Sequence, residues 1–199
     1  DFTHILSLDR SWDDVFSDVS RGHRSSYRKA KREGVEVRRG ESAADWDAYY
    51  GAYQASLERW GDDVSNVHPR ELFDVLRDLS DDHSEHIQLW LAEVDGELAS
   101  GAIVFYWNRH VDYWHGAAHE EYFDHRPNNL LHGVVIEDAI ERGYELYDFN
   151  PSGGHEGVAN FKSRFGADKT HFKRWRYKNP VADGFESAKD SLLDKLDKS

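Results

Sequence analysis

The sequence contains no cysteine, no methionine and only four prolines among its 199 residues. Without cysteine, a disulfide framework, a thiolate zinc site and a cysteine nucleophile are all excluded. No run of about 18 apolar residues is present, and the first residues lack the hydrophobic region of a signal peptide, so we expect a cytoplasmic protein without membrane insertion. Because even an initiator methionine is missing, we expect a processed or excised piece of a longer protein.

The composition is sufficient for one folded domain. Apolar residues make up 39% of the chain and aromatic residues 14%, which supplies enough core-forming side chains. The net charge is -13, aspartate outnumbers glutamate and arginine outnumbers lysine, a bias typical of salt-adapted (halophile-like) acidic proteins. We therefore treat residues 1–199 as a single domain with a strongly acidic surface.

Positive charge is concentrated in two stretches of this acidic chain. Residues 21–39 hold eight Lys or Arg against two acids, and residues 162–178 hold seven against one. A solvated helix face and an edge strand would explain both stretches, and so would a polyanionic ligand. We hypothesise that the two stretches converge on one face around a ligand cleft.

The first part of the chain is predicted to be mostly helical. Residues 1–33 are interpreted as a helical lead-in with helices over 13–20 and 21–33, followed by a strand over 35–38. Ser42 is expected to cap an amphipathic helix that runs to Trp60, and Pro69 to start another.

The remainder is predicted to form a sheet with one crossover. Strands over 87–94 and 97–107 flank Asp95-Gly96, a pair that favours a type I′ hairpin turn. The other expected elements are a strand over 111–118, a helix capped by Asn128 or Asn129 and running to Arg142, a strand over 144–149, a helix over 156–165, a strand over 170–177 and a helix over 181–198. The fold class is α+β: a mixed sheet with an antiparallel meander and then a strand-helix-strand crossover, flanked by helices. The core is placed at 34–178 and a C-terminal helix at 179–199.

A set of short motifs occurs in one order along the chain. They are Tyr27-Arg28-Lys29-Ala30, Arg59-Trp60-Gly61, Tyr113-Trp114-His115-Gly116, Arg126-Pro127-Asn128, Tyr147-Asp148-Phe149, and Phe161-Lys162 with Phe165-Gly166. In this order the chain resembles the FemAB-like group of GNAT-fold acyltransferases, which includes peptidyl aminoacyltransferases. Members of the group often carry two tandem GNAT units, and this chain resembles the second unit.

The resemblance implies a donor site at the start of the crossover helix. A helix N-terminus offers unpaired N–H groups and a positive dipole end to phosphate, and we assign Arg126, Asn128, Asn129 and Lys29 to donor binding. GNAT enzymes place a glycine-rich turn here, whereas this segment has no glycine before Gly133. The donor is therefore left open between acyl-CoA and aminoacyl-tRNA.

The resemblance also implies catalytic residues. Lys162 would stabilise negative charge on the reacting carbonyl, the alternative being a surface lysine. Asp148 would orient the attacking amine, or pair structurally with Lys162 or an arginine. Tyr113 and His115, two apart on a strand and so expected on one face, would handle the proton, or be hydrogen-bonded sheet residues.

The acceptor and the reaction follow as expectations. We assign Arg59, Trp60 and Phe161 to acceptor binding and expect a small-molecule or saccharide amine as acceptor, with tRNA as a candidate partner. No metal site is expected, because His115 and His119 are about 13 Å apart on an extended strand. The expected activity is N-acyl transfer by direct attack. The alternative is a non-catalytic module that binds an anionic glycan or nucleotide.

Overall fold

The computed structural model describes residues 1–61, 67–173 and 175. Its elements in chain order are β1 (Phe2–Ser7), α1 (Trp12–Asp18), α2 (Arg21–Arg32), β2 (Glu36–Gly40), α3 (Ala43–Trp60), α4 (Arg70–Asp82), β3 (Ile87–Val94), β4 (Glu97–Trp107), β5 (His110–Ala118), η2 (Glu120–His125), α5 (Pro127–Glu141), β6 (Leu146–Asp148), α6 (Glu156–Ser163) and β7 (Asp168–His171).

The strands form one mixed sheet in the order β2-β3-β4-β5-β6-β1-β7. Strands β3, β4 and β5 make an antiparallel meander, and α5 then connects β5 to β6, which pair in parallel. The predicted α+β class, with a meander followed by a strand-helix-strand crossover, is therefore confirmed.

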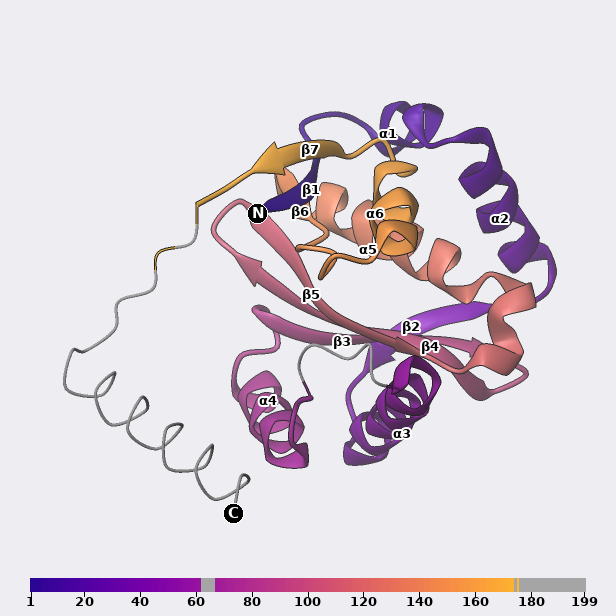
Figure 1. Cartoon of the computed structure of the whole chain (residues 1–199), viewed down its shortest axis with the longest axis vertical. Coiled ribbons are helices and arrows are strands. Elements are labelled where there is room, and N and C mark those ends of the chain that lie inside the picture. The colour runs from indigo at the N-terminus through magenta and orange to yellow at the C-terminus, as the bar shows by residue number, and fades with distance from the viewer. Residues whose placement is uncertain (62–66, 174, 176–199) are drawn as a thin grey trace, which may run out of the picture.

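Helices cover both faces of the sheet (Figure 1). On one face α3 and α4 pack below the meander around Tyr49, Tyr53 and Phe73. On the other face α1, α2 and α5 enclose a larger core that includes Tyr147 and Phe149. The sheet thus separates two apolar cores, and the strands of the meander contribute side chains to both.

Local signals located several elements correctly. Ser42 caps α3 and forms a capping box with Asp45, as its position before an apolar stripe predicts. Asp95 and Gly96 both have positive φ, 52° and 83°, which gives the expected turn between β3 and β4. These elements follow from residues adjacent in sequence, so no long-range contact was needed to predict them.

The helical lead-in predicted for residues 1–33 is wrong at its start. Residues Phe2–Ser7 form β1, which lies inside the sheet between β6 and β7 and pairs antiparallel with both. Thr3 and His4 are each only 5% exposed. Because polar residues occupy these buried positions, the segment shows no alternation of apolar and polar residues from which a strand could be predicted.

The N-cap predicted for the crossover helix is also wrong. Arg126, not Asn128 or Asn129, is the N-cap of α5, with a left-handed φ of 61° and no side-chain capping bond. Pro127 takes the first helical position, where its missing N–H and fixed φ are tolerated. Both asparagines therefore lie in the first turn of the helix.

Some predicted features lie outside the described residues. They are the C-terminal helix placed at 179–199 and part of the strand predicted over 170–177, of which β7 supplies the beginning. Among the helices that are described, none has both the length and the apolar composition of a membrane span.

A close contact between α2 and α5 gives a stability prediction. A Cβ on Gly133 would come within 2.4 Å of the Tyr27 ring, which itself packs against Phe16. We expect Gly133→Ala to lower the free energy of unfolding by about 1–2 kcal/mol, because overpacking outweighs the gain in helix propensity. Gly51→Ala in α3 is the control, since no atom lies within 4 Å of its added Cβ. Denaturant unfolding of both variants measures this, and equal stability changes would contradict it.

Candidate active site

Strands β5 and β6 part soon after they pair. Their parallel pairing covers only His110–Asp112 of β5 and Leu146–Asp148 of β6. A β-bulge in β5 lies just beyond this point, because Ile103 of β4 pairs with His115 while Val104 pairs with Tyr113. The bulge leaves Trp114 as an extra residue, and it changes the direction of the side chains that follow.

The bulge overturns the prediction that Tyr113 and His115 share a face. The Tyr113 ring lies 4.6 Å from the His132 ring, on the side of the sheet covered by α5. The His115 ring lies 4.9 Å from Tyr53, on the side covered by α3. Two residues two apart share a face only on a regular strand, and the bulge adds one residue to the count.

A cavity of about 840 Å³ occupies the space where the two strands part. Both Tyr113 and His115 line it despite their opposite directions, and Lys162 of α6 lines it from across the gap. Its other lining residues include Tyr53, Trp60, His68, Trp114, Phe149 and the 150–153 segment. Three of the four predicted catalytic residues, with Trp60, therefore meet at one cavity.

Lys162 is the buried cation of this cavity. The residue is 5% exposed, and its Nζ donates to the carbonyl oxygens of Asn150 at 2.8 Å and Pro151 at 3.2 Å. Burial lowers the pKa of Lys162 to about 8, and the nearby charge of Asp148 opposes that shift. An ammonium has three N–H donors, so one donor remains for a group that enters the cavity.

Asn150 connects the parted strands to Lys162, and the sequence analysis did not single it out. Its side-chain amide donates to Asp112 and to the Tyr113 carbonyl of β5, and its backbone N–H donates to Asp148 of β6. Asn150 has a left-handed φ of 61°, a conformation that asparagine tolerates better than most residues. An asparagine followed by proline after a buried strand was the available signal.

Asp148 does not reach the cavity. It accepts hydrogen bonds from Thr3 and the Asn150 N–H, and its carboxylate lies 3.8 Å from His110 Nε2. Burial alone would raise the pKa of Asp148, but the bonds from His110 and Thr3 outweigh it and lower the pKa. The neighbouring Asp112 carboxyl has its pKa raised to about 6 by burial and by Asp148. Asp148 therefore pairs structurally, which was one of the two alternatives predicted for it. Its partners are His110 and Thr3, however, and not Lys162 or an arginine.

His115 and Tyr113 are both neutral at pH 7. Burial lowers the pKa of His115 to about 3, and the hydroxyl of Tyr49 lies 2.6 Å from its Nδ1. Burial raises the pKa of Tyr113 to about 12. A Cβ at Gly116 would lie 1.8 Å from the Tyr113 hydroxyl, so a side chain at this position would displace that hydroxyl.

A second cavity of about 390 Å³ lies at the N-terminus of α5. The predicted donor residues Arg126, Asn128 and Asn129 line it, together with Arg164 and Phe161. Asn129 is 7% exposed, and its Nδ2 has no hydrogen-bond partner within the described residues. Neither Arg126 nor Arg164 forms an ion pair with any of the residues that the structure describes. The sequence analysis missed Arg164 as a site residue, although it falls in the second basic stretch.

The other predicted site residues lie beside these cavities in different roles. Arg59 donates to the Ala118 carbonyl at 3.1 Å at the end of β5. Lys29 donates to the Asp124 carbonyl of η2 and pairs with Glu33 at 3.5 Å. Phe161 lines the α5 cavity and not the one at Lys162, with its ring 4.8 Å from His23. Arg59 and Lys29 therefore hold segments that lead to the site.

The hypothesis that the two basic stretches converge is only partly correct. The α2 residues Gly22 and His23 share the α5 cavity with Arg164. However, Arg38 and Arg39 of the first stretch lie on β2 and Lys169 of the second lies on β7, and these two strands form opposite edges of the sheet. In β2, Arg38 pairs with Asp45 and Glu93, and Arg39 pairs with Asp138. The β2 arginines are thus held by carboxylates, and they line neither the cavity at Lys162 nor the one at the N-terminus of α5.

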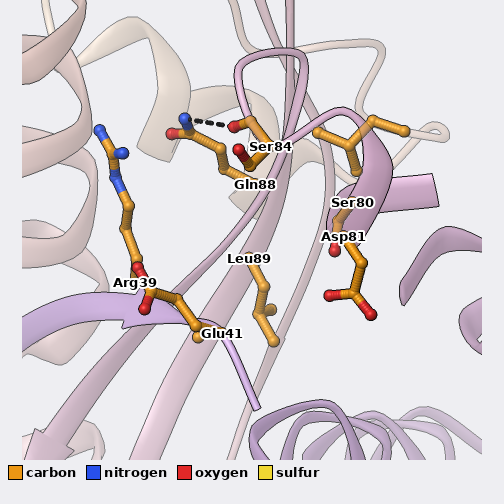
Figure 2. A pocket seen from close by; sticks show the side chains of 9 residues that line it. Arg39, Glu41, Ser80, Asp81, Ser84, Gln88 and Leu89 are labelled. Atoms are coloured by element: carbon orange, nitrogen blue, oxygen red, sulfur yellow. Dashed lines mark hydrogen bonds between the residues drawn. The ribbon is translucent and has the colours of Figure 1, made fainter. Parts of the chain in front are cut away.

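A further pocket of about 260 Å³ lies between β2, β3 and the end of α4 (Figure 2). Two of its polar side chains are already paired. The Gln88 amide donates to the Ser84 carbonyl at 2.9 Å, and the Arg39 guanidinium donates to Asp138 at 3.0 Å. None of its residues lines the cavity at Lys162. Across the described residues, no group of three or more acidic or histidine side chains is placed to hold a metal ion.

Comparison with known proteins finds a family and relatives that are similar to this chain in sequence. Residues 17–174 match the family model described as acetyltransferase (GNAT) domain. A curated UDP-N-acetylmuramoylpentapeptide-lysine N(6)-alanyltransferase of Weissella viridescens is 26% identical over 125 residues, 63% of this chain and 35% of that protein. The chain therefore spans about a third of the length of this curated relative.

Solved structures share the fold at low sequence identity. The crystal structure of FemX matches with a TM-score of 0.72 and 17% identity, covering 85% of this chain and 59% of that one. The structure of AAC(6')-Iy in complex with a bisubstrate analog, CoA-S-monomethyl-acetylneamine, matches with a TM-score of 0.57 and 12% identity, covering 73% and 98%. The Fem-type similarities are those that the sequence motifs predict.

The buried histidines give a pH prediction. Burial lowers the pKa values of His115 and His132 to about 3, below the ordinary histidine value of 6.5. Between these values the unfolded chain binds protons that the folded chain does not. We therefore expect stability to fall as the pH drops below about 6.5, each histidine contributing up to roughly 1.4 kcal/mol per pH unit.

The variant His115→Gln tests this prediction. Its free energy of unfolding should decrease less steeply between pH 6.5 and 4.5 than that of the wild type, while the two slopes should agree between pH 7 and 8. Urea unfolding across this range provides the measurement. An unchanged acid slope in His115→Gln would mean that this imidazole is protonated in the folded protein.

Proposed function

Because this chain belongs to the acetyltransferase (GNAT) domain family, a family of N-acyltransferases, we propose that it moves an acetyl or aminoacyl group from a phosphate-bearing donor to a primary amine. The observation that carries the proposal is the buried ammonium of Lys162 in the cavity where β5 and β6 part. The proposed donors are acyl-CoA and aminoacyl-tRNA, and the proposed acceptor is a small-molecule or saccharide amine.

The reaction that we propose is a direct attack. The amine nitrogen bonds to the donor's carbonyl carbon, and the bond from that carbon to the donor's sulfur or oxygen breaks. The proton released by the amine passes to the leaving group or to solvent. Negative charge builds on the carbonyl oxygen in the transition state, and the free N–H of Lys162 is the donor to that oxygen.

Three features of Lys162 support this role. Two backbone carbonyls fix the position of its ammonium, so little reorganisation accompanies the reaction. With a pKa of about 8 the group is largely protonated at pH 7. The residue is also only 5% exposed, and a setting with little water strengthens its interaction with a developing oxyanion.

The neutral side chains across the cavity from Lys162 are suited to orient the amine of the acceptor. His115 is neutral at pH 7, and its Nδ1 is engaged with Tyr49, so the far edge of its imidazole is the part available to the acceptor. The Tyr113 hydroxyl has no hydrogen-bond partner within the described residues. In this proposal both groups orient the acceptor nitrogen by hydrogen bonds, and their pKa values of about 3 and 12 argue against net proton uptake or release.

The donor's phosphate belongs in the α5 cavity in this proposal. The helix N-terminus supplies a positive dipole end, and Arg126 and Arg164 supply two guanidinium groups that form no ion pair among the described residues. The unpartnered Nδ2 of Asn129 supplies a further donor. Phe161 and Lys162 are consecutive on α6, so this helix connects the phosphate end of the donor to the reacting carbonyl.

The test of this function compares donors directly. The protein is incubated with labelled acetyl-CoA and, separately, with charged tRNA, each with a panel of primary amines that includes amino sugars. Label transferred to an amine supports the proposal and identifies the donor. Turnover with neither donor, together with tight binding of anions, would favour a non-catalytic module for an anionic glycan or nucleotide.

Kinetic variants separate the roles of the two cations. We expect Lys162→Ala to lower kcat by about 10²- to 10³-fold, the effect of removing one oxyanion donor. Lys162→Arg should restore only part of the rate, because a planar guanidinium does not fit the place of an ammonium. Arg126→Ala should mainly raise the KM for the donor.

The measurement is steady-state kinetics with saturating acceptor. Arg126→Ala and Lys162→Ala act as controls for one another, since the first should change the KM for the donor and the second should change kcat. An unchanged kcat in Lys162→Ala would remove the lysine from the mechanism.

A further inference from the structure

A third cavity adjoins the one at Lys162. It has a volume of about 880 Å³ and lies between the start of β1, the 151–155 loop, α6 and Lys169 of β7. Five residues line both cavities, namely Pro151, Ser152, Gly153, His155 and Glu156. The carbonyl of Pro151 also accepts a bond from Lys162. A ligand in this third cavity would therefore contact the loop that holds the catalytic ammonium.

Two polar atoms in its wall are enclosed and unpartnered. His4 is 5% exposed, and its Nδ1 has no hydrogen-bond partner within the described residues. Ser152 is half-buried, and its Oγ also has no hydrogen-bond partner within the described residues. A buried polar group without a partner costs about 1–3 kcal/mol, and neither side chain takes part in the pairing of β1 with β6, which uses backbone hydrogen bonds and the Thr3–Asp148 hydrogen bond. Both residues line the cavity, and turning either side chain towards it would let a ligand supply the missing partner.

The chemistry of the wall indicates the class of ligand. Burial, then the charges of Lys162 and Lys169, lower the pKa of His4, so its imidazole is neutral and carries one donor and one acceptor. The serine hydroxyl and the side-chain amide of Asn160 also both donate and accept. The charged groups of the lining have both signs, with Lys169 opposed by Asp1 and Glu156. Such a wall favours neutral groups that donate and accept at once, which are hydroxyls.

An aromatic ring completes this wall. Phe2 lines the cavity, and Lys169 Nζ lies 3.8 Å from the centroid of its ring. A flat apolar ring beside several groups that both donate and accept matches a molecule with an apolar face and a hydroxyl-bearing edge. A saccharide ring has this form, whereas a free phosphate has no apolar face.

We propose that this cavity binds the saccharide ring of the acceptor, with His4, Ser152 and Asn160 as its hydrogen-bonding groups. The proposal rests on the proposed function, because it names the substrate class whose amine reaches Lys162. Ser152, which lines both cavities, marks the point where the amine would pass from the ring to the reacting centre.

Equilibrium binding tests the proposal without any turnover. Glucosamine and cyclohexylamine carry the same amine on a six-membered ring, but only glucosamine has hydroxyls. We expect glucosamine to bind at least tenfold more tightly, as observed by calorimetric or NMR titration of the full chain. His4→Phe and Ser152→Ala should each weaken glucosamine binding by about tenfold and leave cyclohexylamine unaffected, as expected for the loss of one hydrogen bond.

Ser17→Ala, on the exposed surface of α1 and outside the cavity, is the matched control and should bind glucosamine like the wild type. Equal affinity for the two amines would overturn the proposal, as would unchanged glucosamine binding in Ser152→Ala, a variant that preserves the packing around β1. Competition by inorganic phosphate at lower concentration than glucosamine would instead identify an anion site. Glucosamine binding without acyl transfer would support the saccharide site and reject the proposed function.

Discussion

The candidate active site depends on the separation of two parallel strands and on a residue, Asn150, that bridges them. Asn150 binds Asp112 and the Tyr113 carbonyl of β5 through its side chain and Asp148 of β6 through its N–H. Its own carbonyl, turned by a left-handed φ, accepts the ammonium of Lys162. The position of the buried cation is therefore determined by the same contacts that fix how far the strands part. The separation of β5 and β6 and the position of the Lys162 ammonium thus depend on the same hydrogen bonds of Asn150.

The bulge in β5 extends this constraint to the opposite wall. By adding Trp114 to the strand, it directs His115 towards the α3 core while Tyr113 stays with the α5 core. Both side chains nevertheless line the gap, because the sheet no longer separates its two faces beyond the point where β5 and β6 part. Gly116 then leaves the space that the Tyr113 hydroxyl occupies. Residues that belong to different cores thus reach a common cavity.

Helix α6 connects the parts of the site. Phe161 lines the cavity at the N-terminus of α5, Lys162 lines the cavity between the strands, and Asn160 lines the cavity beside β1. Three consecutive residues of a helix point about 100° apart, so one short helix presents a side chain to each cavity. Burial of Lys162 without a carboxylate partner costs stability, which the two carbonyl bonds and the charge of Asp148 offset.

The sequence by itself determined the elements that depend on neighbouring residues, among them the capped helix after Ser42, the hairpin at Asp95-Gly96 and the order of meander and crossover. The resemblance carried by its motifs also selected Lys162 as a candidate catalytic residue, and the start of the crossover helix selected Arg126 and Asn129 as candidate donor-binding residues. Only the tertiary structure decided that residues Phe2–Ser7 join the sheet, that Asp148 pairs with His110 and that Asn150 bridges the strands. The physical reason is that strand pairing, bulges and burial depend on residues distant in sequence, and polar residues at buried positions give no local pattern.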